Sequence, residues 1–204
     1  SAASDVYKRQ NQDKPSDESG NLLPENSYGD VLTVMPLGAP KGSTNGQPVT
    51  MNAGATPWGV NYAMMGASGL NSGSWASSRM RSTTMPQYLA KLPQATQNAI
   101  GYVQKVTGTY NGSNSGGGNS VTGDKCFLLS GKEIFGGSGA SNGSFCTTNE
   151  AAETFQYQYF QSIATTPASR NINSSANQWL WLRSPGYSYG DYFCIVYALS
   201  LIHI

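Results

Sequence analysis

Charge is scarce in this chain. Charged side chains make up 11% of the residues, against about 25% in ordinary globular domains. The 12 basic and 11 acidic residues nearly cancel, and lysine and arginine form no cluster. Nucleic acids and anionic membranes are bound through such clusters. We therefore expect a protein that binds no nucleic acid and does not insert into a membrane.

Histidine and paired cysteine are scarce as well. His203 is the single histidine, and Cys126, Cys146 and Cys194 contain no C-x-x-C spacing. Zinc sites need closely spaced Cys and His ligands, so we expect no metal and no cofactor. We interpret the cysteines as buried small apolar residues with free thiols. A single disulfide is the alternative.

Glycine, serine, asparagine and aromatic residues are abundant instead. Aromatic residues reach 11% of the chain, which argues against disorder because disordered segments are poor in them. The length of 204 residues suits one domain with a linker. This uncharged, aromatic composition is typical of extracellular, cell-surface or virion proteins.

The two ends of the chain are related to each other as DNA. Residues 5–10 (DVYKRQ) back-translate as GATGTGTATAAGAGACAG, and the reverse complement of that string encodes LSLIHI, the sequence of residues 199–204. Both ends therefore resemble translated transposase sequencing adapter, as in a metagenomic fragment. We expect residues 1–10 to be unpacked, residues 199–204 to form strand only through their apolar composition, and the native fragment to contain no histidine.

The first half of the chain combines a linker with a helical region. Residues 11–57 are polar and rich in proline and glycine, and predict a linker with one entering strand at 31–37; the domain proper then covers 58–198. Apolar residues recur at three and four positions over 85–106, which predicts a helix that Pro93 divides into two short ones. A Gly/Ser/Asn loop is expected at 111–123.

The second half predicts strands and two further helices. CFLL at 126–129 predicts a short buried strand, and Ser130 with Glu133 forms a capping box that opens one helical turn. A second capping box opens a helix with three apolar residues on one face. Thr147 and Glu150 form this capping box, and the three apolar residues are Phe155, Tyr159 and Ile163.

The C-terminal part predicts a strand at 178–182, a turn at 183–186 and a strand at 192–198. Helices and strands are segregated along the chain and do not alternate as βαβ units. The fold class predicted from this order is α+β.

Four segments, in order, resemble an uncharacterised WLRSP-motif domain family that is common in surface proteins of gut bacteria and their phages. The resemblance covers 58–198 and implies a C-type-lectin-like fold, akin to that of the formylglycine-generating enzymes, that displays ligands. Family members continue with further strands, which implies that this domain is truncated at its C-terminus. The segments are 73–81 (GSWASSRMR), 89–107 (LAKLPQATQNAIGYVQKVT), 125–136 (KCFLLSGKEIFG) and 179–186 (WLWLRSPG).

The residues predict no enzyme. A Ser/His or Cys/His nucleophile system needs a histidine base, and the spacing of the acidic residues indicates no glycosidase pair. The cysteines lie in contexts unlike the copper-binding pair of the formylglycine-generating enzymes. The Glu-Pro-Asn or Gln-Pro-Asp loop of calcium-dependent lectins is absent too.

Six residues are predicted to be structural. Trp179 and Trp181 lie two positions apart on one strand face and could stack on a sugar, but burial in the core is the preferred interpretation. Arg183 is interpreted as one half of a buried ion pair with Glu133, with an anion-binding role as the alternative. The structural set is Trp75, Arg81, Glu133, Trp179, Trp181 and Arg183.

The candidate binding segment is 186–192 (GYSYGDY). Tyrosine gives a large amphipathic contact area at low entropic cost, while serine and glycine adapt to a partner. An ordinary hairpin loop is the alternative. The sequence thus predicts a non-catalytic, extracellular module that binds a glycan or protein, on a bacterial surface or phage tail; a purely structural spacer is the alternative. The ligand-binding candidates are Tyr187, Ser188, Tyr189, Asp191 and Tyr192.

Overall fold

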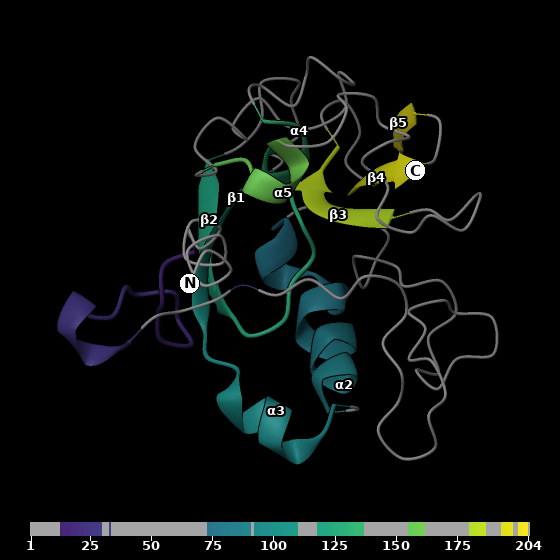
Figure 1. Ribbon diagram of the computed structural model, residues 1–204. Helices are drawn as coiled ribbons and strands as arrows, with labels where there is room; N and C mark the ends of the chain where they lie inside the picture. Colours follow the sequence, from purple (N-terminus) through teal and green to yellow (C-terminus); the bar gives the residue numbers. More distant parts are fainter. Residues whose placement is uncertain are drawn as a thin grey trace.

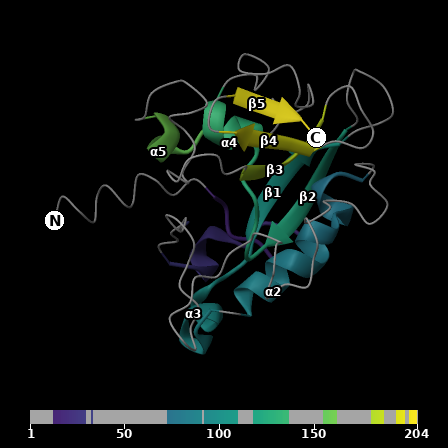
Figure 2. The same ribbon diagram turned by 90° about the vertical axis from the view of Figure 1, so that its right-hand side faces the viewer.

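The computed structural model describes residues 13–29, 33, 73–90, 92–109, 118–136, 155–161, 180–186, 193–197 and 200–203. For 180, 181, 195–197 and 200–203 it describes the backbone alone. Within these residues, short helices accompany one two-stranded and one three-stranded sheet (Figures 1 and 2). The predicted α+β class is confirmed for the described residues.

The first sheet pairs β1 (Val103–Gly108) with β2 (Asn119–Asp124) in antiparallel register. The N-terminal segment lies along the other edge of β1, where Pro15 bridges Val103 and the carbonyl of Lys14 accepts a hydrogen bond from the Gln104 amide at 2.8 Å. The start of the segment interpreted as a linker, residues 13–16, therefore packs along β1. Backbone hydrogen bonds to β1 hold the start of this segment against the domain, and a short 3-10 helix, η1 (Glu25–Ser27), follows.

The second sheet has the antiparallel order β3 (Leu180–Pro185), β4 (Phe193–Tyr197) and β5 (Ser200–His203). The expected turn at 183–186 was wrong for its first residues, because β3 runs through Pro185 and the Arg183 amide donates to the carbonyl of Leu129 at 2.9 Å. β5 falls in the adapter-like segment 199–204, so that segment pairs with β4. Residues 1–10 lie outside the described part of the chain.

The predicted helical region is shorter than expected. A 3-10 turn η2 (Trp75–Ser77), a π-helical turn η3 (Met80–Thr84) and α2 (Met85–Leu89) precede α3 (Gln94–Ala99). Pro93 stands at the start of α3, so the predicted division is confirmed. The helix does not continue to residue 106, because the β-branched residues there form β1. The expected loop at 111–123 likewise gives way to β2 from residue 119 onward.

The segment 126–129 belongs to no strand, contrary to expectation. Its carbonyls at Leu128 and Leu129 accept hydrogen bonds from Arg183, so these two groups are satisfied without a paired strand. The capping box that follows is confirmed at the start of α4 (Gly131–Phe135). Gly136, with φ of 66°, ends this helix in the left-handed region that favours glycine.

The next helix, α5 (Gln158–Gln161), buries a different face from the one predicted. Phe160 is 1% exposed, whereas Tyr159 is 38% exposed and Phe155 precedes the helix. Because Phe155 lies before the described helix, the four-residue spacing does not put it on one helix face with Tyr159, and Phe160 is the helical residue that faces the core. Thr147, Glu150 and Ile163 lie outside the described residues.

Two apolar clusters form the described core. The first joins α4, α5, β3 and β4, and the second joins the η2–α2 region to β4. Trp75 is completely buried, in agreement with its predicted core role, whereas Trp179 and the side chain of Trp181 lie outside the described part. The clusters consist of Ile134, Phe135, Tyr157, Phe160, Leu182 and Cys194, and of Trp75, Met80, Met85, Leu128 and Phe193.

Candidate functional site

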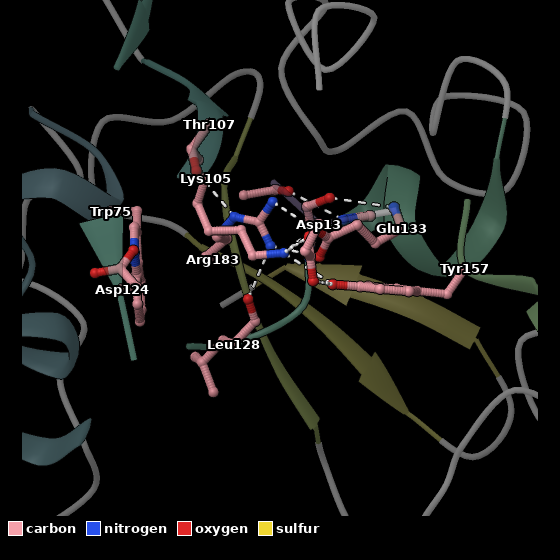
Figure 3. Close-up of polar contacts among 12 residues, drawn as sticks. Asp13, Trp75, Lys105, Thr107, Asp124, Leu128, Glu133, Tyr157 and Arg183 are labelled. Atoms are coloured by element: carbon pink, nitrogen blue, oxygen red, sulfur yellow. Dashed lines mark hydrogen bonds and ion pairs between the residues drawn. The ribbon is translucent and has the colours of Figure 1, made fainter. Parts of the chain in front are cut away.

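Five polar residues from separate parts of the sequence meet in the interior (Figure 3). We call Asp13, Lys105, Glu133, Tyr157 and Arg183 the buried ionic cluster. The N-terminal segment, β1, α4, the residues before α5, and β3 each contribute one member. The four charged side chains are 2–3% exposed, which removes them from bulk water.

Lys105 is the centre of the buried ionic cluster. Val103, Lys105 and Thr107 alternate along β1 toward the interior, which buries the lysine. Its Nζ donates to Asp13 Oδ1 at 2.5 Å, to the Tyr157 hydroxyl at 2.8 Å and to Glu133 Oε1 at 3.1 Å. These three acceptors use all the donor capacity of the ammonium group.

An aromatic ring covers the same ammonium group. The Phe127 ring centroid lies 3.8 Å from Lys105 Nζ. A cation at this distance from an aromatic face is stabilised by the ring quadrupole. The ring also limits access of water to the lysine.

Asp13 is held through both of its carboxylate oxygens. Oδ1 accepts from Lys105, while Oδ2 accepts from the Tyr157 hydroxyl and from the Thr33 hydroxyl, each at 2.6 Å. The carboxylate therefore connects the N-terminal segment to both β1 and the region before α5. Unpaired burial of such a group would be strongly unfavourable.

Arg183 and Glu133 form the ion pair predicted from the sequence. The Nη1–Oε2 and Nη2–Oε1 distances are 2.5 and 2.9 Å. Arg183 also donates to the Leu128 carbonyl and the Thr107 hydroxyl, each at 2.9 Å. Because the Arg183 side chain is 2% exposed and directed at these partners, the geometry favours the ion-pair interpretation over an anion-binding role.

The protonation of the cluster follows from its charges. Burial by itself would raise the pKa of Glu133, but the positive charges of Arg183 and Lys105 outweigh it and lower the pKa from 4.5 to about 2. Burial, together with the negative charges of Glu133 and Asp13, raises the pKa of Tyr157 far above its ordinary value of 10. At neutral pH the tyrosine therefore keeps its proton and donates it in a hydrogen bond.

A second polar cluster surrounds Asp124, the last residue of β2. Asp124 accepts from Trp75 Nε1 at 2.8 Å, from Thr122 at 2.7 Å and from Arg81 Nε at 2.6 Å. The predicted structural roles of Trp75 and Arg81 agree with these contacts. Burial, followed by the charge of Asp124, raises the pKa of the neighbouring Cys126 thiol to about 12.

The structure does not describe the predicted ligand-binding residues. Tyr187, Ser188, Tyr189, Asp191 and Tyr192 lie outside the described residues. The strands on either side of them are described: β3 and β4 pair through Pro185 and Phe193.

Sequence reasoning missed three members of the buried ionic cluster. Asp13 was placed in a linker, and neither Lys105 nor Tyr157 was singled out. One signal was available for Lys105, because it alternates with Val103 and Thr107 in a β-branched segment. No local signal links Asp13 to Lys105, which stands 92 positions further along the chain.

The described residues carry no recognisable metal or membrane feature. No group of three or more His, Cys, Asp and Glu side chains among them is arranged to hold a metal ion. In the same part of the chain, no helix has the length and apolarity to cross a bilayer. Cys126 is a free thiol, Cys194 has no exposed surface, and Cys146 lies outside the description.

Comparison with known proteins gives a family but no characterised relative. No curated protein and no solved structure matches this chain. One family model, described as a domain of unknown function (DUF6273), matches residues 61–201, which is more than half of the sequence. The chain therefore belongs to the DUF6273 family of domains of unknown function.

Proposed function

We propose that this chain is a non-catalytic, extracellular module with a C-type-lectin-like fold that binds a glycan or protein ligand on a bacterial surface or phage tail. The observation that carries the proposal is the pairing of Pro185 with Phe193. Pro185 and Phe193 flank the tyrosine-rich segment 186–192, so the paired antiparallel strands β3 and β4 hold the two ends of this segment together.

The base of this segment is firmly anchored. Ser184 and Cys194 have no exposed surface, and Phe193 is 2% exposed. Two residues before Pro185, Arg183 is fixed by its ion pair with Glu133. A rigid base lowers the entropy that a recognition segment loses on binding, which favours affinity.

The composition of the segment suits recognition. Three tyrosines, one serine and two glycines stand among its seven residues. Tyrosine side chains dominate many binding surfaces because each combines a large apolar ring with a hydroxyl at little entropic cost. Asp191 adds a carboxylate that can accept hydrogen bonds from sugar or peptide donors.

The buried ionic cluster supports a structural role for the interior of this protein and argues against turnover of a substrate there. Its two positive and two negative charges offset one another inside the protein, and its members are closed to solvent. A substrate-processing site needs access to solvent and groups left available for the substrate.

Binding of the full chain to a printed glycan array and to a panel of extracellular host proteins tests the proposal. We expect at least one ligand to bind, and expect the triple variant Tyr187→Ser, Tyr189→Ser, Tyr192→Ser to lose that binding while its thermal melting is nearly unchanged. The matched control is Tyr159→Ser, which removes an exposed tyrosine elsewhere.

Two results would contradict the proposal. Binding that survives the triple substitution would place the site elsewhere. No binding of the wild-type chain to either set of ligands would favour the alternative function, a purely structural spacer.

A further inference from the structure

We propose that Lys105 and Asp13 condense inside the buried ionic cluster to form an intramolecular isopeptide bond, a covalent link between β1 and the N-terminal segment. The inference does not rest on the binding function proposed above. It rests on the arrangement of a nucleophile, an electrophile, a proton acceptor and two hydroxyl donors in one site (Figure 3).

The reacting groups are already in contact. Lys105 Nζ lies 2.5 Å from Asp13 Oδ1, and both side chains are 2% exposed. Holding an amine against a carboxyl group in a fixed orientation removes most of the entropic barrier to a reaction that is very slow between free molecules in water. Because both groups belong to one folded chain, the contact is maintained for the lifetime of the fold.

The second oxygen of Asp13 accepts the hydrogen bonds that would stabilise the carbonyl oxygen of a reacting carboxyl group. Oδ2 accepts hydrogen bonds from the hydroxyls of Tyr157 and Thr33, each at 2.6 Å. Two donors on one oxygen polarise the carboxyl carbon and stabilise the negative charge that develops on that oxygen when an amine adds. The raised pKa of Tyr157 keeps its hydroxyl protonated for this role.

Glu133 is placed to accept the lysine proton. Its Oε1 lies 3.1 Å from Lys105 Nζ, and its pairing with Arg183 keeps it ionised. After transfer of one lysine proton to Asp13 Oδ1 across the 2.5 Å contact, the neutral amine of Lys105 carries the lone pair that attacks the carbonyl carbon of the uncharged Asp13 carboxyl group. Glu133 accepts the second proton from the nitrogen as the C–N bond forms, and returns it to the departing oxygen, which leaves as water.

The reaction balances without any co-reactant. A C–N bond forms between Asp13 Cγ and Lys105 Nζ, and the bond from Cγ to Oδ1 breaks. Oδ1 takes two protons that originate on the lysine ammonium and leaves as water. Oδ2 becomes the amide oxygen and keeps its two hydroxyl donors, and no atom is oxidised or reduced.

The surroundings favour the amide product. Phe127 and Tyr157 cover the lysine, so water that would reverse the reaction has little access. Condensation removes one positive and one negative buried charge, and each carries a desolvation cost. The Glu133–Arg183 pair that remains is itself electrically balanced.

Mass spectrometry of the denatured full chain tests the bond. We expect the intact mass to lie below the sequence mass by one water molecule. A tryptic digest under denaturing conditions should then contain a branched peptide that joins residues 10–41 to residues 92–125, because Lys14 precedes proline and an acylated Lys105 resists trypsin.

Three variants separate the chemistry from the fold. Lys105→Arg keeps the positive charge without the nucleophilic amine and should show no loss of water. Glu133→Gln removes the proton acceptor and should slow formation on the order of a hundredfold or more. Tyr157→Phe removes one donor from Oδ2 and should slow formation on the order of a hundredfold. Near-UV circular dichroism of each variant checks its folding.

The proposal does not depend on the folding of these variants, because the branched peptide is read from the wild-type chain. A wild-type mass equal to the sequence mass would overturn it and leave Lys105 and Asp13 as a non-covalent ion pair. A loss of water located within a single linear peptide, as in succinimide formation, would overturn it as well.

Discussion

Arg183 on β3 and Glu133 on α4 meet in a two-pronged ion pair, with N–O distances of 2.5 and 2.9 Å, although 50 positions separate them in the sequence. The same carboxylate accepts from the Ser130 amide at 2.9 Å and so completes the capping box of α4. One side chain therefore fixes the start of a helix and ties that helix to a strand.

Replacement of Arg183 by Ala is expected to lower the free energy of unfolding by about 3–5 kcal/mol. The substitution leaves the Glu133 carboxylate buried without its guanidinium partner. Urea denaturation of both proteins measures the difference.

Arg81→Ala is the matched control for that experiment. Arg81 also pairs with a carboxylate, that of Asp124, but its side chain is 26% exposed. Water can partly replace this interaction, so the loss should be clearly smaller. Equal losses for the two arginines would show that burial of the Arg183 pair is not what makes it important.

Acid should destabilise the fold as the pH falls from about 4.5 to about 2. The pKa of Glu133 is lowered on folding from 4.5 to about 2, so its charged form stabilises the native state above pH 4.5. That contribution decreases as the pH falls from about 4.5 toward 2. We expect the urea midpoint to fall across this range, and expect Glu133→Gln to show a smaller decrease from its own lower starting value.

Asp17→Asn provides the comparison for the acid range. Hydrogen bonds from Asn21 and neighbouring amides lower the pKa of Asp17, but this carboxylate is exposed. The Asn variant should therefore retain most of the acid-induced loss. If it abolished the loss and Glu133→Gln did not, Glu133 would not be the controlling group.

Gly123→Ala should release the N-terminal segment. A Cβ at position 123 would lie 1.9 Å from the backbone oxygen of Asp17, and backbone at that distance must move. We expect faster proteolysis of residues 13–29, measured by limited digestion and mass spectrometry. Gly118→Ala, where a Cβ would meet nothing within 4 Å, is the control and should digest like the wild type.

The described cysteines should react slowly in the native state. Burial raises the pKa of Cys126 to about 12, so little thiolate is present at neutral pH, and Cys194 has no exposed surface. Alkylation with iodoacetamide, located by mass spectrometry, should modify both much faster in denaturant. Rapid native labelling of Cys126 would contradict its buried environment. An odd number of cysteines cannot pair completely, and we expect thiol titration in denaturant to give three free groups. A value of one would show that two of the cysteines form a disulfide.

Local rules in the sequence determined part of this structure. The Ser130–Glu133 capping box, the division of the helices at Pro93 and the strand that begins near residue 193 all depend on neighbours within a few positions. Such interactions are encoded by spacing alone, so they could be predicted. The pairing of Arg183 with Glu133 was also accessible, because a buried arginine requires a carboxylate and few follow Asp124.

The tertiary structure alone decided the remainder of the site. Asp13, Lys105 and Tyr157 span 144 positions, and no local pattern brings a polar N-terminal residue beside a strand lysine. β1 likewise replaced an expected helix, because pairing with β2 outweighs the weak helical periodicity of residues 103–106. The physical reason is the same in both cases: burial and backbone pairing between distant segments contribute free energy that no short window of sequence contains.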